Sequence, residues 1–589
     1  MNKQTMITMR KLLTIMLIAF WAMGAYAQTN ETATEAVKNM GVGWNLGNTL
    51  DANGAKVSDP ANDAYWGCQG LESETYWGQA VTTSALMTMM KEAGFGAIRV
   101  PVTWYNHMDK TGKVKAEWMK RVHEVVDYVI DNGMYCVLNV HHDTGADGNS
   151  KSWLKAEEAW YAKYKDKYEY LWQQIAEEFK DYDGKLLFES YNEMLDTSNS
   201  WCFASFAAPG NYNATLATSA YNAINSYAQS FVDVVRASGG KNADRNLIVN
   251  TYAACNGYGT WNSHLADPVK KMKLPQDVVE NHLIFEVHSY PAISNKNNQG
   301  VVTNRQMSEI KKEIDGTISV LKDNLMLKGA PVIIGEWGTS NVDSGDGKTD
   351  YDARKDLMMQ FVDYYVSKTK ENGMAMFYWM GLTDGAYRAE PAFSQPDLAE
   401  RIVKAYHGND FKGVYPEPKK HTSVTSFEGD KLADWGNGIT IASNVFKSIG
   451  EGAQLELTYK LEVTDYDDIQ LFLGDWSKGI DFQVDGTTVS SDFKPRSFYN
   501  VPNGTELTTV FTFDSTTYAL LAQKGLIIHG RGFRIYKAVV FDPSAASEVK
   551  NLHAETKGDD AVYNMAGQRV KSLGKGVYIS NGKKMYSHR

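Results

Sequence analysis

The chain has 589 residues, of which 43% are hydrophobic, and its formal net charge is −10 with a sequence pI near 5.7. This length predicts two or more domains. The negative charge argues against nucleic acid or another polyanion as a partner.

The first 27 residues have the layout of a secretory signal peptide. Lys3, Arg10 and Lys11 precede an apolar run at residues 12–24, and small residues follow at 25–27. The apolar run is too short for an ordinary membrane span. We therefore expect a secreted mature chain with no membrane span, cleaved near Ala27 and located outside the cell, at its surface or in the periplasm.

Strand-like and helix-like segments alternate from about residue 41 to residue 408. Helical periodicity is present at residues 118–132, 164–182, 221–238, 351–372 and 397–407. Eight repeats predict a TIM (β/α)₈ barrel over residues 28–412, with enlarged loops at 51–79 and 196–213. A doubly wound sheet is the alternative, but its Gly-rich phosphate loop is missing from the sequence. The predicted strands are residues 41–47, 97–102, 135–142, 186–193, 246–252, 283–290, 332–338 and 374–380.

The composition changes after the barrel. Two prolines within the polar residues 413–422 indicate a linker. Short β-type runs then predict an all-β sandwich, jelly-roll-like, over residues 423–545. Residues 546–589 are expected to form a short tail with two strands around residues 574–576. The β-type runs are residues 439–442, 455–463, 469–473, 508–513, 525–529 and 533–541.

The four cysteines permit two disulfides in an oxidising compartment. Cys136 lies inside an apolar strand pattern, and we expect it to be a buried free thiol. Spacing does not fix the pairing of Cys68, Cys202 and Cys255, and a bridge between Cys68 and Cys202 is one option.

Two glutamates stand at the ends of predicted strands. Glu193 ends the segment at 186–193, and Glu336 follows the apolar run at 331–335. The C-terminal ends of barrel strands converge on one pocket. Two carboxylates that meet there can cleave a glycosidic bond, one as proton donor and the other as nucleophile or base.

Other strand ends add polar and aromatic side chains. Arg99 lies within a predicted strand, where a charge is costly unless it is paired with an opposite charge. A guanidinium beside a carboxylate keeps that carboxylate ionised. Asn192 is placed to hydrogen-bond a sugar 2-hydroxyl. Whether His141 or its neighbour His142 enters the site is left open. His288, Tyr290 and Trp379 complete the set.

Six motifs occur at residues 43–49 (GWNLGNT), 98–104 (IRVPVTW), 138–143 (LNVHHD), 191–193 (YNE), 288–290 (HSY) and 334–338 (IGEWG). In order and spacing they resemble glycoside hydrolase family 5, the cellulase family of clan A, over about residues 35–408. The resemblance implies a retaining enzyme with Glu193 as acid/base and Glu336 as nucleophile. Met194 stands where many members have proline. The eight core residues of the family correspond to Arg99, His141, Asn192, Glu193, His288, Tyr290, Glu336 and Trp379.

The resemblance implies a secreted endo-β-1,4-glucanase that cleaves internal bonds of cellulose or related β-glucans by double displacement. We expect Trp379, Trp104 and Trp44 to stack on successive sugar rings. The alternatives are a mannanase, a xyloglucanase or a transglycosylase of the same mechanism, and a non-catalytic polysaccharide-binding protein. Intact Glu193 and Glu336 argue against the last of these, because binding alone needs neither.

We expect no metal and no organic cofactor. The sequence has no CxxC or HExxH signature, and Asp346, Asp350 and Asp352 are interpreted as a solvated acidic loop. The expected partner is a β-linked polysaccharide or oligosaccharide, bound by a monomer.

The C-terminal region carries weaker signals. Trp435, Tyr466 and Trp476 fit either sugar stacking or the sandwich core, and the core is the preferred interpretation. The tail resembles C-terminal segments of secreted Bacteroidetes proteins, some of which direct secretion.

Overall fold

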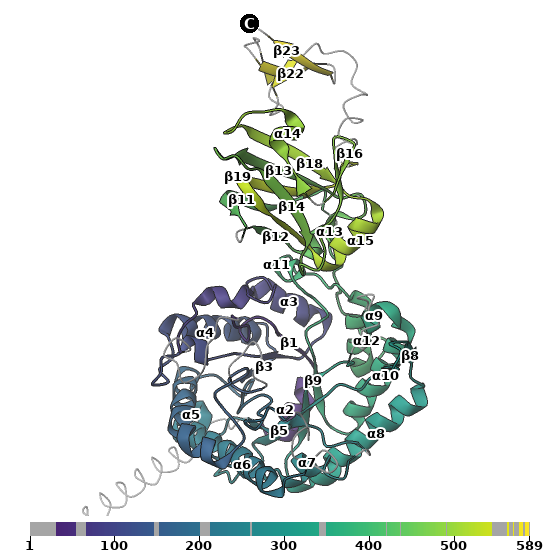
Figure 1. The fold of residues 1–589 in the computed structure, drawn as a ribbon. Coiled ribbons are helices and arrows are strands. Elements are labelled where there is room, and N and C mark those ends of the chain that lie inside the picture. Colours follow the sequence, from purple (N-terminus) through teal and green to yellow (C-terminus); the bar gives the residue numbers. More distant parts are fainter. Residues whose placement is uncertain are drawn as a thin grey trace, which may run out of the picture. The chain divides into compact units, whose positions relative to one another are not determined.

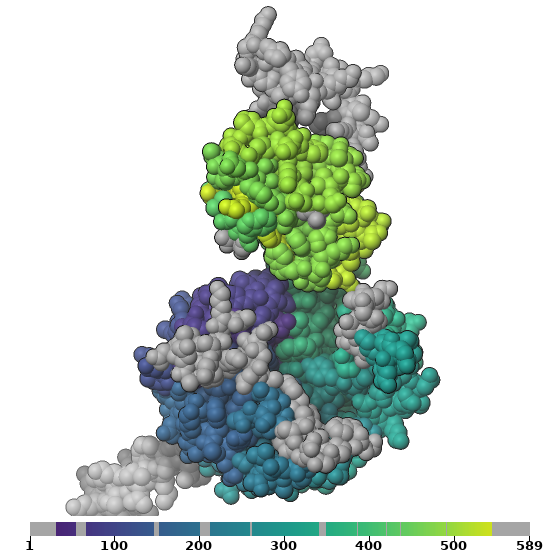
Figure 2. Space-filling view, viewed as in Figure 1, coloured from purple at the N-terminus to yellow at the C-terminus, as the bar shows by residue number. Residues whose placement is uncertain are grey.

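The computed structural model describes residues 31–54, 66–145, 152–200, 212–259, 262–340, 349–419, 421–435, 438–490 and 492–544, and four short strands between 562 and 587. The chain divides into two compact units, Met1–Glu417 and Pro418–Arg589. Figures 1 and 2 colour the first from purple to teal and the second from green to yellow. The predicted signal peptide lies outside the described residues.

Eight parallel strands close into a barrel in the first unit, and β10 returns to β1. The TIM-barrel prediction is confirmed, and each predicted strand is present. Most strands end earlier than expected, so Glu193 lies in the loop beyond β4 rather than at its last position. The strands, in barrel order from β1 through β2, are β1 (Val42–Asn45), β2 (Ala97–Val100), β3 (Tyr135–Asn139), β4 (Leu186–Glu189), β5 (Leu247–Cys255), β6 (Leu283–Ser289), β9 (Val332–Trp337) and β10 (Ala375–Tyr378).

Helices surround the barrel strands (Figure 1). They are amphipathic: α4 buries Trp118, Val122, Val125 and Val129 at helical spacing. In the described part of the chain, no helix combines the length and apolar character needed to cross a bilayer. The helices are α3 (Ser84–Ala93), α4 (Ala116–Asp131), α5 (Glu158–Glu178), α6 (Ala214–Ala237), α7 (Asp267–Lys271), α8 (Met307–Asn324), α9 (Asp350–Ala353), α10 (Lys355–Glu371), α11 (Ala386–Ala389) and α12 (Pro396–His407), and a hairpin is formed by β7 (Ser294–Lys296) and β8 (Val302–Asn304).

Strand alternation divides the barrel interior into two layers. Near the N-terminal ends of the strands the layer is apolar and packs against helix α2 (Ala33–Met40) in one buried cluster. Two positions further along, the same face carries polar side chains, because successive side chains of a strand point to opposite faces. The interior therefore becomes polar toward the C-terminal ends of the strands. The apolar layer includes Ala97, Val137, Leu187, Ile248, Ile284 and Ile333, and the polar layer includes Arg99, Asn139, Glu189, Asn250 and Glu286, all fully buried.

The second unit is built on antiparallel strands around its own apolar core. Strand β19 hydrogen-bonds to β11, β12, β13 and β14. Residues 525–529 and 533–541, expected as two strands, belong to this one strand. Gly530 and Gly532 between them serve close backbone packing: a Cβ would lie 1.8 Å from Asp468 O and 1.9 Å from Tyr466 O, respectively. The strands are β11 (Ser423–Asp434), β12 (Ile439–Ile441), β13 (Gln454–Leu461), β14 (Asp468–Leu473), β15 (Phe482–Val484), β16 (Thr487–Val489), β17 (Asp492–Phe493), β18 (Glu506–Thr512) and β19 (Leu526–Phe541).

Three helices interrupt the strands of this unit, and the sequence analysis did not predict them. They are α13 (Ser443–Ile449), α14 (Pro495–Tyr499) and α15 (Ser515–Lys524). The tail forms a small antiparallel sheet of β20 (Val562–Asn564), β21 (Arg569–Val570), β22 (Gly576–Ser580) and β23 (Lys583–Ser587).

The cysteines separate into free and bonded. Cys136 is a buried free thiol, as predicted, and burial raises its pKa. Cys68 is also free, so a bridge between Cys68 and Cys202 is wrong. Cys255 is disulfide-bonded. Cys202 lies outside the described residues.

Candidate active site

Arg99, on β2, is the centre of the polar layer. Its guanidinium donates to both Glu189 carboxylate oxygens, at 2.7 and 2.8 Å. It also donates to Glu336 Oε1 at 2.8 Å, to Asn192 Oδ1 at 2.8 Å and to Asn45 Oδ1 at 3.0 Å. Arg99 has no exposed surface. A buried charge is tolerated only when it is paired and hydrogen-bonded, which these contacts accomplish.

Glu336, on β9, is held at both carboxylate oxygens. Arg99 donates to Oε1, and the Tyr290 hydroxyl donates to Oε2 at 2.6 Å. Burial and the neighbouring Glu336 carboxylate raise the pKa of Tyr290, so its hydroxyl keeps its proton and remains a donor. The Glu336 side chain retains 7% of its exposure. The carboxylate is thus fixed in place but still reachable at the open end of the barrel.

His288, on β6, connects the two glutamates. Its Nδ1 lies 2.7 Å from Glu193 Oε1 and 3.5 Å from Glu336 Oε2. Glu193 is the more open of the two, with 21% of its side chain exposed. One ligand atom from each of the three residues lies within 4.8 Å of the other two. Burial lowers the pKa of His288, but Glu336, Glu193 and Glu286 together raise it to about 10, so the imidazole is charged at neutral pH.

Two further glutamates in the polar layer were missed by the sequence analysis. Glu189 ends β4 and Glu286 lies in β6, and both are fully buried. Burial raises the pKa of Glu189, but its ion pair with Arg99 outweighs that effect and lowers it. Burial and the Glu189 charge raise the pKa of Glu286 to about 8.

The geometry also indicates that Glu189 is ionised and that Glu286 carries a proton. Neither Glu286 oxygen accepts a well-aligned hydrogen bond from the described residues, which disfavours a buried anion. Arg99 Nε and His288 Nε2 lie 3.4 and 3.3 Å from Glu286 Oε1. The sequence held a signal for both glutamates. Each one interrupts an apolar strand at a position that strand alternation directs toward the barrel interior, as it does Arg99 and Asn139.

The structure decides between the two adjacent histidines. His141 Nε2 lies 4.0 Å from Glu336 Oε1, and its ring stacks parallel to Trp379 with a centroid separation of 5.9 Å. Burial, the neighbouring His142 and the positive charges of Arg99 and His288 lower the pKa of His141, so it is neutral. His142 points instead toward Asp51, 3.6 Å away. Trp379 follows β10 directly and is partly exposed, so it can present an indole face.

Trp44 and Trp104 cannot act as predicted. Both side chains have 0% exposure, so neither offers a ring face to a sugar. Trp104 donates from its indole nitrogen to Asn139 O at 3.0 Å. Trp44 lies under the Arg388 guanidinium, 5.0 Å from the ring centroid, and donates to Met380 O at 3.3 Å. These two residues stabilise the barrel, and the prediction that they stack on substrate is wrong.

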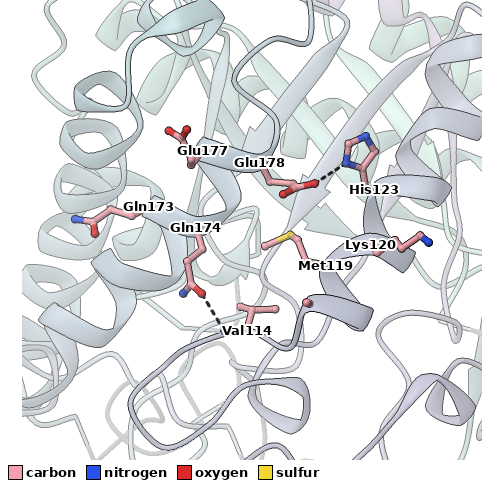
Figure 3. A pocket seen from close by; sticks show the side chains of 9 residues that line it. Val114, Met119, Lys120, His123, Gln173, Gln174, Glu177 and Glu178 are labelled. Carbon is pink, nitrogen blue, oxygen red and sulfur yellow. Dashed lines mark hydrogen bonds and ion pairs between the residues drawn. The ribbon is translucent and has the colours of Figure 1, made fainter.

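A surface hollow between α4 and α5 lies apart from these carboxylates (Figure 3). His123 bonds Glu178 there at 2.6 Å, and Gln174 accepts from the Val114 backbone at 2.9 Å. Its lining shares no residue with the site around Arg99. Of the acidic residues considered for a metal, Asp346 lies outside the described residues, and Asp350 is bonded to Arg354 at 2.9 Å.

Comparison with known proteins matches this geometry to a family. A profile described as Cellulase (glycosyl hydrolase family 5) matches residues 50–383, inside the barrel unit. The chain belongs to glycosyl hydrolase family 5. Endoglucanase B of Neocallimastix patriciarum is 32% identical over 375 residues, 63% of this chain and 69% of that protein. The family 5 chain is thus a glycoside hydrolase of the endo-β-glucanase type.

Two solved structures extend the comparison. A GH5-4 broad specificity endoglucanase from an uncultured bacterium is 60% identical, with a TM-score of 0.59, and the match covers 65% of this family 5 enzyme and 98% of that chain. A family 5 enzyme from Prevotella bryantii, a mutant in complex with a xyloglucan tetradecasaccharide, is 40% identical with a TM-score of 0.54. That match covers 64% of this enzyme and 99% of the other chain.

Gly335 precedes Glu336 and has no room for a side chain. A Cβ there would lie 1.5 Å from Glu286 Oε1, and Glu286 is confined by Arg99 and His288. We expect Gly335→Ala to cost about 1–3 kcal/mol or more of stability and to displace Glu336. Gly338→Ala is the control, since its nearest contact would be 3.7 Å away. Urea unfolding measures the stability of both variants, and kcat/KM measures their activity. Equal stability and activity of the two variants would contradict a steric clash between residue 335 and Glu286.

The proton on Glu286 predicts a pH dependence of stability. Its pKa of about 8 exceeds the ordinary 4.5, so this group's contribution is complete below pH 4.5 and is lost as the pH rises to about 8. Gln cannot ionise, so Glu286→Gln should flatten the fall of the unfolding free energy across that window.

Glu189→Gln is the matched control. It removes a charge paired with Arg99, so it should destabilise the enzyme by about 3–5 kcal/mol near neutral pH. Urea denaturation at pH 5, 7 and 9 measures both variants. If Glu286→Gln were as damaging as Glu189→Gln at pH 5, Glu286 would be the ionised member of the pair.

Proposed function

We propose that this enzyme is a secreted, monomeric endo-β-1,4-glucanase that retains the anomeric configuration. The observation that carries the proposal is the close approach of Glu193 and Glu336, which have carboxylate oxygens within 4.8 Å of each other. Retaining enzymes hold the two carboxyl groups about 5–5.5 Å apart, whereas inverting enzymes need about 6.5–9.5 Å to admit a water. The short approach supports a covalent intermediate.

In the first step, a Glu336 oxygen attacks the anomeric carbon while Glu193 gives its proton to the departing glycosidic oxygen. The C–O bond to the leaving sugar breaks and a glycosyl ester of Glu336 forms. The ester has lost the negative charge of Glu336, which favours the deprotonated form of Glu193. In the second step, Glu193 takes a proton from water, the water oxygen attacks the anomeric carbon, and Glu336 leaves as a carboxylate.

The surrounding residues support these roles. Arg99 and Tyr290 donate to Glu336 and stabilise the negative charge that must attack and later leave. His288 contacts both Glu193 and Glu336 and fixes their positions relative to each other. Asn192, its Oδ1 fixed by Arg99, lies beside Glu193 and would bond a sugar 2-hydroxyl through its amide group.

The substrate proposal rests on relatives and on one aromatic platform. The similar proteins are named endoglucanases, and one similar structure holds a xyloglucan oligosaccharide. Trp379, partly exposed and stacked with His141, would floor the sugar ring that is attacked. We propose β-1,4-glucan as the main substrate and xyloglucan as a second one.

The remaining parts of the proposal concern location and organisation. A signal peptide at residues 1–27 would direct secretion. The tail at residues 546–589 would serve as a second secretion signal. All eight family residues come from one chain, so a monomer suffices. The linker at 413–422 would join the catalytic barrel to an accessory domain at 423–545.

Leaving-group dependence tests the roles of the two glutamates. Glu336→Ala should abolish hydrolysis of every glycoside. Glu193→Ala should slow natural glucans by about 10²–10⁴-fold, but activated aryl glycosides much less in the first step, because a good leaving group needs little protonation. Steady-state and burst kinetics on both substrate types measure this. Equal losses on the two types would reject the acid/base role of Glu193.

A substrate panel tests the class of polymer. Carboxymethyl cellulose, mixed-linkage glucan, xyloglucan and mannan are compared by kcat/KM, with product sizing to separate internal from terminal cleavage. We expect the two unbranched glucans to lead, xyloglucan to be cleaved and mannan to be poor. A preference for mannan would overturn the glucanase assignment and leave the two-glutamate mechanism standing.

A further inference from the structure

Three large aromatic side chains lie on the surface of the second unit. Trp435 is 43% exposed, Tyr466 41% and Trp476 55%. The preferred sequence interpretation, that they form the core of this unit, is therefore wrong. The core consists of other apolar residues, which fill it without these three. Packing inside the core does not explain three large aromatic side chains that are exposed in one unit.

Strand pairing brings the three residues to one face. Along β14, Ile469, Leu471 and Leu473 point into the core, so Gln470 and Phe472 point outward. Gln470 lies opposite His529 on β19. Trp476 follows in the turn after β14, and Tyr466 precedes that strand. Trp435 directly follows β11, and its backbone N–H donates to Gly530 O at 3.0 Å.

The rings form a continuous row. Trp435 has its centroid 6.1 Å from that of Tyr466 and 5.4 Å from that of His529. His529 in turn lies 5.1 Å from Trp476, which also contacts Phe472 at 5.4 Å. The row thus runs from Tyr466 through Trp435 and His529 to Trp476. An extended ligand with repeated flat faces could contact several of these rings at once.

The backbone at both tryptophans is held in an unusual conformation. Trp435 has φ of 24° and Trp476 has φ of 61°, a region that bulky residues rarely adopt. Core packing of the indole rings does not explain it, since both rings are exposed. Strained backbone conformations cluster at active sites, ligand clamps and switch regions.

Polar groups of both signs border the row. Asp434 pairs with Arg531 at 3.6 Å, beside Trp435, and Asp475 pairs with Lys524 at 2.8 Å, beside Trp476. Gln470 donates to Asp468 at 2.9 Å between them. The three carboxylates and two cations mix donors and acceptors and include no excess of positive charge, which suits a neutral ligand rich in hydroxyl groups better than an anionic polymer or an anionic membrane.

We propose that Trp435, Tyr466, His529 and Trp476 form a binding face for a β-1,4-linked glucan chain. Apolar faces of sugar rings stack on the aromatic row, and the bordering polar groups bond the hydroxyls. The choice of glucan rests on the proposed function, because the barrel of the same chain is proposed to cleave that polymer. The face would hold the enzyme on insoluble substrate and take no part in bond cleavage.

The test uses the full chain carrying Glu336→Gln, so that bound polymer is not cut. Trp435→Ala, Trp476→Ala and the double variant are compared in depletion assays on insoluble cellulose. We expect each single change to weaken binding about tenfold, as is typical of central aromatic anchors, and the double change to leave only the affinity of the barrel. Phe498→Ala is the matched control: Phe498 is an aromatic residue of this unit, 37% exposed, whose ring contacts Phe493 and Tyr499, neither of which belongs to the row.

Three further measurements keep the outcomes distinct. In the active chain the double variant should hydrolyse soluble glucan with unchanged kcat/KM. Trp→Phe at both positions should retain most of the binding, which separates stacking from loss of folding. If the double variant binds cellulose as well as the parent chain does, and the active enzyme cleaves glucan, the proposed binding face is wrong and the proposed function stands. A face that retains mannan but not cellulose, in a chain that cleaves mannan, would instead overturn the glucan assignment.

Discussion

The site depends on the burial of one guanidinium. Arg99 bonds four side chains, which come from β1, from β4 and the loop that follows it, and from β9, namely Asn45, Glu189, Asn192 and Glu336. Taking that cation away would leave the buried Glu189 carboxylate without its counter-ion and Glu336 with His288 as its remaining positive neighbour, and such a loss is strongly destabilising. The contacts that neutralise these charges also set the positions of the groups. Folding and alignment of the site are therefore consequences of the same interaction.

Much of the fold and site could be predicted from local sequence, because strand ends of a barrel converge wherever the strands occur. Glu193, Glu336, His288 and Tyr290 were found for this reason, and they lie together. Glu286 was not found: strand alternation indicates that it faces inward, but one glutamate in an apolar strand carries no local sign of its partners. Its role follows from the charges around it, which come from β2, β4 and β6 and meet only in the folded barrel.

Aromatic residues were the hardest to place from sequence, because an indole ring suits both a core and a sugar-binding surface. Trp44 was expected at the substrate and lies in the core, whereas Trp435 was expected in the core and lies at the surface. The alternation of side chains along β1 could have placed Trp44 correctly. Asn45 points inward to Arg99, so Trp44 must point outward to the helices. Trp435 follows the end of its strand, where alternation no longer applies.

The close approach of Gly335 to Glu286 links two positions on neighbouring strands. The sizes of the two residues are coupled: a larger residue at 335 needs a shorter one at 286, and a shorter residue at 286 leaves a void beside Arg99 that a methyl group at 335 could fill. A change of side-chain size at one of these two positions therefore calls for a compensating change at the other. Few combinations of residues therefore fit at positions 335 and 286, which lie beside the buried charges around Arg99.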